Sequence, residues 1–130
     1  LVEQLSGKMR PILKFLFPDL PTDCEAARQI SVNFIANILG LGWAATPAGL
    51  KAMKELEKTS QRKGVASDEM AMLVVLNTAS LQLIPTTTAA LRLANGSTAP
   101  MEILPAVWLA SSVSILAGIL TAKFLSGRFR

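Results

Sequence analysis

The sequence contains no histidine, and Cys24 is its only cysteine among 130 residues. The absence of histidine excludes Ser-His and Cys-His catalysis and any histidine-ligated zinc site. A single thiol forms no disulfide framework within the chain, and because it lies between Asp23 and Glu25 we expect it to be unreactive.

Charged residues are missing from three long stretches, residues 30–50, 70–91 and 103–122. Each stretch has about the 20 residues that, at a rise of about 1.5 Å per residue, cross the hydrocarbon core of a bilayer. A helix of a soluble bundle needs a polar face, and here only Asn, Ser, Thr and Gln are available to form one. The sequence therefore predicts an integral membrane protein, and the alternative is a soluble bundle with buried helices.

The 13 basic residues, which give a net charge of +4, are scattered outside these stretches, as in the flanks of membrane spans rather than in a nucleic-acid site. If the stretches are three simple spans, Lys and Arg divide five to eight between the two sides. The excess on the second side places residues 51–69 and the C-terminus in the cytoplasm, and a re-entrant segment would change this parity. The two sides hold Lys8, Arg10, Lys14, Arg28 and Arg92, and Lys51, Lys54, Lys58, Arg62, Lys63, Lys123, Arg128 and Arg130.

The N-terminal segment, residues 1–21, has Leu, Ile and Phe at helical spacing with basic residues between them. This pattern predicts an amphipathic helix at the membrane interface that ends at Pro18 and Pro21. The tail of a truncated transmembrane helix is the alternative. Thr22 or Asp23 is the expected cap of the helix that follows.

The expected fold is all-α and integral to the membrane, a single domain over residues 1–130 with about three apolar helical segments, two of them interrupted or re-entrant. Ser67, which two acids follow, is the expected N-cap of the second segment, and residues 94–100 predict a tight turn before the third. The segments are a broken apolar helix running into a polar amphipathic helix (30–63), a second broken apolar helix (70–92) and a transmembrane helix (103–125).

The first apolar stretch carries Gly40, Gly42 and Pro47 where an uninterrupted hydrophobic helix would carry leucine. Each glycine weakens a helix by about 1 kcal/mol and the proline by about 3 kcal/mol. In lipid a break persists only where protein or a water-lined cavity satisfies the freed backbone groups. We predict unwinding between residues 40 and 47, with Thr46 as the N-cap and Pro47 as the first residue of a new half-helix.

The second apolar stretch repeats the order of an asparagine, Asn77, then apolar residues, then proline beside threonine, Pro85 and Thr86. In the first stretch the asparagine is Asn37. Since consecutive spans cross in opposite directions, the two breaks are expected to face each other near the midplane in inverted orientation. Paired interruptions of this kind are typical of the binding site of a transporter or channel.

Asn33 and Asn37 are one helical turn apart, so they offer paired amide groups on one face. The polar groups near the breaks carry no charge, which suits a neutral, hydrogen-bonding solute or water better than a divalent ion. The candidate pathway or gate residues are Asn33, Asn37, Gly40, Gly42, Thr46, Pro47, Asn77, Thr78, Gln82, Pro85 and Thr86.

The alternative for these residues is interhelical packing, with hydrogen bonds worth about 0.6 kcal/mol each and glycines that allow close approach. We expect that packing role for Ser31, Ser111, Ser112, Ser114 and Gly118.

Three motifs, NFIANILGLGWAATPAGLKAMKEL at 33–56, LNTASLQLIPTTTAALR at 76–92 and LFPDLP at 16–21, together resemble the spore maturation protein A family. The similarity runs from about Leu5 to Leu120 and looks like the C-terminal two thirds of that family, without its N-terminal transmembrane segment. Trp43 departs from a smaller or polar residue in the family, which would narrow a pathway. The family motif falls on Asn33, Asn37, Gly40, Gly42, Ala45, Thr46, Pro47, Asn77, Thr78, Pro85 and Thr86, and implies their place in a gate or pathway.

The resemblance implies an integral protein of the bacterial cell membrane with a nucleoside recognition or Gate domain. It also implies a partner similar to spore maturation protein B and a role of the pair in dehydration of the spore core. Related Gate regions occur in concentrative nucleoside transporters and in ferrous iron transporters of the B type.

We therefore expect a subunit of a Gate-domain transporter or channel that assembles as a homo- or hetero-oligomer, because three short spans are too few to enclose a pore. The second hypothesis is a non-transporting structural or assembly protein. An enzyme is not expected, since the spans hold no charged acid, base or metal ligand and leave only Ser80 or a threonine as a nucleophile. We expect no cofactor, metal or nucleic-acid partner.

Overall fold

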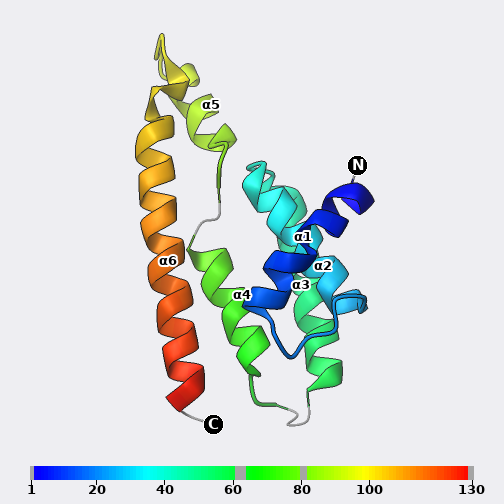
Figure 1. The fold of residues 1–130 in the computed structure, drawn as a ribbon. Helices are drawn as coiled ribbons and strands as arrows, with labels where there is room; N and C mark the ends of the chain where they lie inside the picture. Colours follow the sequence, from blue (N-terminus) through cyan, green and yellow to red (C-terminus); the bar gives the residue numbers. More distant parts are fainter. Residues whose placement is uncertain (1, 61–63, 80–81, 129–130) are drawn as a thin grey trace.

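The computed structural model describes residues 2–60, 64–79 and 82–128, and this part of the chain contains only helices and their connections (Figure 1). The all-α prediction is confirmed for these residues. The elements are α1 (Val2–Leu16), α2 (Glu25–Ile38), α3 (Gly42–Thr59), α4 (Asp68–Thr78), α5 (Thr86–Ala94), the 3₁₀ turn η1 (Pro100–Ile103) and α6 (Leu104–Arg128).

The predicted N-terminal amphipathic helix is α1, which packs against α2. Met9, Leu13 and Leu16 recur at helical spacing and are buried, whereas Lys14 is exposed. The next residue, Phe17, is buried with its ring centroid 6.3 Å from that of Phe34 on α2. The apolar face of α1 therefore forms part of the protein core, and the position of α1 at a membrane interface stays a prediction.

The N-cap of α2 is Cys24, whose Sγ accepts a hydrogen bond from the backbone N–H of Ala27 at 3.4 Å. The prediction of Thr22 or Asp23 as the cap was wrong. Cys24 has the extended backbone conformation of an N-cap residue, and the carboxylate of Asp23 is instead paired with Arg10 at 2.6 Å.

The first apolar stretch folds back on itself, because α2 and α3 form an antiparallel pair joined by only three residues. Gly40 makes the reversal with φ of +71°, a conformation open to glycine. The predicted start of the second piece at Thr46 was wrong: α3 begins at Gly42, and Pro47 lies inside it. The turn at Gly40 already reverses the chain, so no second break is needed at Pro47. Pro47 cannot donate the helical hydrogen bond to the carbonyl of Trp43, but its φ is compatible with a helix and α3 continues through it.

The N-cap of α4 is Ser67, whose Oγ accepts a hydrogen bond from the backbone N–H of Met70 at 3.3 Å, as predicted. After Thr78 the helix stops, and α5 begins at Thr86 directly after the buried Pro85. This break is the one predicted at the proline. In Figure 1, α5 lies beyond the end of the α2–α3 pair, beside the start of α6.

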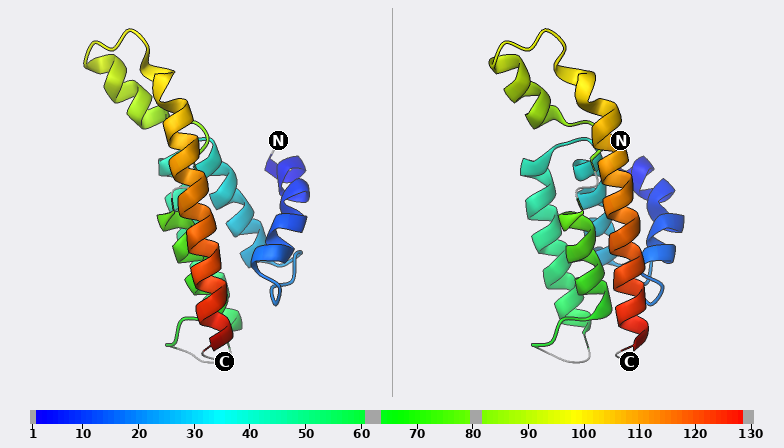
Figure 2. Two further views of the ribbon diagram at one scale, coloured as in Figure 1. Left: turned by 60° about the vertical axis from the view of Figure 1, so that its left-hand side comes forward. Right: turned by 90° about the vertical axis from the view of Figure 1, so that its left-hand side faces the viewer.

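The third apolar stretch is α6, the longest helix in the described part of the chain. Residues Pro100–Leu125 are long and apolar enough to cross a membrane, and none of the most apolar part is buried. Both views in Figure 2 show α6 running along the outside of the other helices. Among the described residues no other helix meets the same criterion, so the expected count of three spans is not confirmed.

One face of α6 packs on α4, with Ile115 and Ile119 half-buried against the core. The remaining surface carries large apolar side chains that are mostly exposed. They recur at helical spacing and are Leu109, Val113, Leu116, Leu120 and Phe124. A helix in the core of a soluble bundle would be mostly buried, so this exposure favours the membrane prediction over the soluble alternative.

Candidate functional site

The two helix breaks lie in direct contact. The carbonyl oxygen of Ile38, at the end of α2, accepts hydrogen bonds from the backbone N–H groups of Leu83 at 3.1 Å and Ile84 at 3.3 Å. The Oγ1 of Thr86, at the start of α5, donates to the carbonyl oxygen of Gly40 at 2.8 Å. We call these three hydrogen bonds the break contact. They satisfy the carbonyl group of Ile38, which an α-helix leaves without a partner at its C-terminal end, and that of Gly40 in the turn that follows.

Gly40 fits the break contact because it has no side chain. A Cβ at this position would overlap the carbonyl oxygen of Ile84 and come within 2.9 Å of Thr86 Oγ1. The amide of Gln82 lies on the same side, 3.2 Å from that Cβ position, and donates to the carbonyl oxygen of Ile84 at 3.3 Å. Both the close approach and the positive φ therefore require glycine here.

Three asparagine side chains form a chain of hydrogen bonds beside the break contact. The Nδ2 of Asn37 donates to the Oδ1 of Asn77 on α4 at 2.9 Å and to the Oδ1 of Asn33 at 3.4 Å. Asn33 Nδ2 donates to the carbonyl oxygen of Ala45 on α3 at 2.8 Å, and Asn77 Nδ2 donates to that of Leu73 at 2.8 Å. We call these three residues the amide chain, and it joins α2, α3 and α4.

The direction of the amide chain follows from its ends. The carbonyl groups of Ala45 and Leu73 only accept hydrogen bonds, so Asn33 and Asn77 turn their Nδ2 atoms toward them. Their Oδ1 atoms then face Asn37, which must present its Nδ2 to both. Asn37 Oδ1 accepts no hydrogen bond from the described residues, and Asn77 has a second N–H beyond the one bonded to Leu73.

The three asparagines differ in burial. Asn33 is 1% exposed and lies against Gly49, where a Cβ would come within 3.0 Å of its Nδ2. Asn37 is half-buried and Asn77 is exposed. Asn33 therefore holds α2 to α3 and offers nothing to an outside molecule, whereas Asn37 and Asn77 lie where a ligand would reach them.

The other predicted site residues lie apart from this contact. Gly42 has no atom near its Cβ position. Thr46 and Thr78 are exposed, and each hydroxyl bonds a carbonyl of its own helix, that of Gly42 at 3.2 Å and that of Val74 at 2.9 Å. Pro47 is exposed on α3, and Trp43 is 80% exposed, so neither lines the break contact within this chain. The structure thus brings together Asn33, Asn37, Gly40, Asn77, Gln82, Pro85 and Thr86.

Two contributors were missed from the sequence. Gly49 gives Asn33 room to reach the backbone of α3, and Trp108 on α6 donates its Nε1 hydrogen to the carbonyl oxygen of Leu83 at 2.8 Å. Gly49 lies about two turns inside α3, and a glycine in a helix interior, where it costs stability, is the sequence signal that a close approach occurs there. No sequence signal joins Trp108 to a backbone carbonyl 25 residues away.

Ser80, which with the threonines was the only nucleophile left for an enzyme that the sequence did not lead us to expect, lies outside the described residues. Within the described residues no group of three or more Cys, Asp or Glu side chains is placed to hold a metal ion. The chemistry at the two breaks is therefore that of neutral amides, hydroxyls and backbone carbonyls.

No protein-family model and no solved structure matches this chain. Spore maturation protein A of Bacillus subtilis (strain 168) is 38% identical to it over 124 residues. The aligned region is 95% of this chain and 63% of that protein, so the chain spans less than two thirds of its relative. At this identity over nearly its whole length, the chain belongs to the spore maturation protein A family.

Proposed function

We propose that this chain is a membrane subunit of a Gate-domain transporter or channel, and that the break contact is its gate. The observation that carries the proposal is the pairing of two interrupted helices through hydrogen bonds from Leu83, Ile84 and Thr86 to the end of α2. Inside a bilayer, irregular backbone is tolerated where it is packed in protein or lines a water-filled cavity. Two such segments in contact are the usual setting of a transport site.

The break contact suits a gate because its hydrogen bonds link segments without a shared helix. Opening would separate Ile38 from Leu83 and Ile84, and Gly40 from Thr86. Water or a polar solute entering the gap would bond the same carbonyl groups, so part of the lost interaction is replaced. A closed and an open arrangement can then differ by only a few kcal/mol.

The unused hydrogen-bonding groups favour a neutral solute. Among the described residues nothing donates to the Oδ1 of Asn37, and Asn77, at an exposed position, has an N–H beyond the one bonded to Leu73. A hydroxyl, an amide or water complements both groups. Neither group carries a charge that would offset the free-energy cost of removing water from an inorganic ion.

The name of the Bacillus subtilis relative supports a role in spore maturation. The family resemblance supports a partner similar to spore maturation protein B and a location in the bacterial cell membrane. The apolar exposed surface of α6 agrees with that location, because lipid would cover it.

The test is solute flux into liposomes that hold the protein alone or with a partner similar to spore maturation protein B. Thr86→Val removes the hydrogen bond to Gly40, and Thr87→Val makes the same change at an exposed neighbour in α5. Loss of about 0.6 kcal/mol from the closed state should raise leak about threefold in the first variant only. Equal flux in both variants and the parent, in a complex that transports, would remove the gate assignment.

One observation favours a second candidate, a structural or assembly protein of the same membrane. The amide of Asn33 makes its hydrogen bonds within the fold, and the hydroxyls of Thr46 and Thr78 donate to carbonyl groups of their own helices. On this alternative, Asn77→Ala lowers the stability of the assembled complex by about 0.6 kcal/mol per lost hydrogen bond and leaves every flux at the background level.

A further inference from the structure

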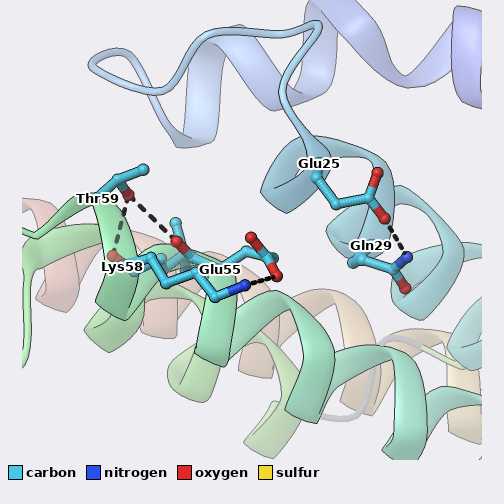
Figure 3. Close-up of polar contacts among 6 residues, drawn as sticks. Glu25, Gln29, Glu55, Lys58 and Thr59 are labelled. Carbon is cyan, nitrogen blue, oxygen red and sulfur yellow. Dashed lines mark hydrogen bonds and ion pairs between the residues drawn. The ribbon is translucent and has the colours of Figure 1, made fainter.

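Charged side chains gather toward one end of the helical bundle. Figure 3 shows the first turn of α2, where Gln29 bonds Glu25 at 2.7 Å, close to the last turns of α3, where Lys58 pairs with Glu55 at 2.6 Å. In Figure 1 α4 begins and α6 ends at this same end. We call it the charged end. The turn between α5 and η1 lies at the opposite end.

The apolar parts of α2 and α3 are too short to cross a bilayer. From Ile30 to Ile38, and again from Gly42 to Leu50, each helix rises about 12 Å. A hydrocarbon core is about 30 Å thick. In a bilayer, apolar segments of this length would reach from the charged end only to about its middle.

The helices α4 and α5 differ from the α2–α3 pair. Whereas α3 turns back toward the charged end, α5 continues away from it. Met70–Thr78 and Thr86–Ala94 each rise about 12 Å. The two rises together make up most of the thickness of a hydrocarbon core, which is about 30 Å. The apolar part of α6, residues 104–122, returns over about 27 Å.

We propose that α2 and α3 are a re-entrant hairpin, that α4 and α5 together make one interrupted span, and that α6 makes a second span. In this arrangement lipid covers the exposed apolar side chains of these segments, and the break contact lies near the midplane of the bilayer. The inference rests on the proposed function only for the membrane location. It requires the α1–α2 loop, the α3–α4 loop and the C-terminus to share one side of the membrane.

The basic residues support this arrangement. Outside α1, Arg92 is in the last turn of α5, next to the α5–η1 turn. Arg28 in the first turn of α2, Lys54 and Lys58 in the second half of α3 and Lys123 near the end of α6 belong to the parts of these helices nearest the charged end. Arg10 of α1 is held toward the charged end too, by its pair with Asp23 at 2.6 Å. Three simple spans gave a division of five to eight, whereas the hairpin gives the strong asymmetry typical of a cytoplasmic face.

The test is labelling of single cysteines in the full chain by a membrane-impermeant maleimide, in right-side-out and inverted vesicles. Cys24→Ser supplies the background. Three single-cysteine variants are made in this background, each at an exposed position: Pro21→Cys in the α1–α2 loop, Val65→Cys in the α3–α4 loop and Thr98→Cys between α5 and η1. Ser60→Cys and Ser97→Cys repeat the comparison should one of these variants fail to accumulate.

The hairpin predicts that positions 21 and 65 are labelled only in inverted vesicles and position 98 only in right-side-out vesicles. Three simple spans would instead place positions 21 and 98 on the same side of the membrane, so both would be labelled in the same vesicles. That result would overturn the hairpin and would leave the proposed transport function standing. A chain that is extracted from vesicles by alkaline carbonate would overturn the membrane location, and with it both this inference and the proposed function.

Discussion

Gly40 and Gly118 lie in two apolar stretches that look alike in sequence, yet they have opposite roles. Gly40 reverses the chain at φ of +71°, whereas Gly118 is an ordinary residue inside α6. The difference lies in what surrounds each one. Thr86 and the connection before it supply donors for the carbonyl groups freed at Gly40. At Gly118 the side chain of Val75 packs closely, so the missing Cβ brings α4 nearer to α6.

The comparison teaches that glycine alone does not break an apolar helix. A break needs polar partners placed elsewhere in the chain, since unpaired backbone groups cost several kcal/mol away from water. The first apolar stretch has such partners in Thr86 and the connection before it, whereas the third stretch runs as the unbroken helix α6.

The largest expected effect is that of Gly40→Ala. The new methyl group would overlap the carbonyl oxygen of Ile84, and alanine at this positive φ is strained, so we expect a loss of about 3 kcal/mol. Gly42→Ala is the matched control, because nothing lies near its Cβ position. Thermal unfolding in detergent, followed by circular dichroism, measures both, and equal midpoints would contradict the role given to Gly40.

Asn33→Ala should have the next largest effect, about 2 kcal/mol. It deletes a buried amide that bonds Ala45, and it leaves the Nδ2 of Asn37 with one fewer acceptor. Asn95→Ala is the control, since this exposed asparagine bonds only its own helix and should change stability by less than about 0.5 kcal/mol. Chemical denaturation of the detergent-solubilised protein compares the two, and a larger loss for Asn95→Ala would sink this account.

Gly118→Val tests the other glycine and should cost about 1.5 kcal/mol. Its Cβ would approach a methyl group of Val75 to 2.9 Å and push α6 from α4, since β-branched side chains adjust little. Val75→Ala removes the obstacle. The double variant should then recover at least about 0.5 kcal/mol relative to the sum of the single variants, and strict additivity would show that the two positions do not meet.

Trp108→Phe should have the smallest effect, about 0.6 kcal/mol, because it removes one hydrogen bond to the carbonyl oxygen of Leu83. Trp43→Phe serves as the control, since Trp43 is 80% exposed. Thermal unfolding in detergent compares the two variants by the difference between their midpoints. A lower midpoint for Trp43→Phe would mean that Trp43 contacts more of the protein than the structure shows.

Local signals were enough to predict several elements. Ser67 capped a helix as its sequence context indicated, Pro85 and Thr86 marked the start of α5, and Gly40 marked a break. Each depends on backbone chemistry within a few residues, where sequence patterns are informative. The order of asparagine, proline and threonine also pointed to a meeting of the two breaks, which are in contact.

The rest depended on partners distant in sequence. Pro47 suggested a helix start, but the reversal at Gly40 made that unnecessary and left Thr46 inside α3. Asn33 and Asn37 were expected to face one ligand together. The structure keeps them bonded to each other but buries Asn33, because Gly49 lets its Nδ2 reach the carbonyl oxygen of Ala45. Spacing along one helix says which side chains share a face, and only the fold says what occupies that face.

The most direct test of the central claim is a reversible cross-link across the break contact. Leu39→Cys and Ile84→Cys, both at exposed positions, would be joined in a Cys24→Ser background by a short bifunctional methanethiosulfonate in the assembled, transporting complex. If the break contact is the gate, linking stops solute flux, reduction restores it, and neither single-cysteine variant responds. Flux that continues unchanged after complete linking would contradict the account.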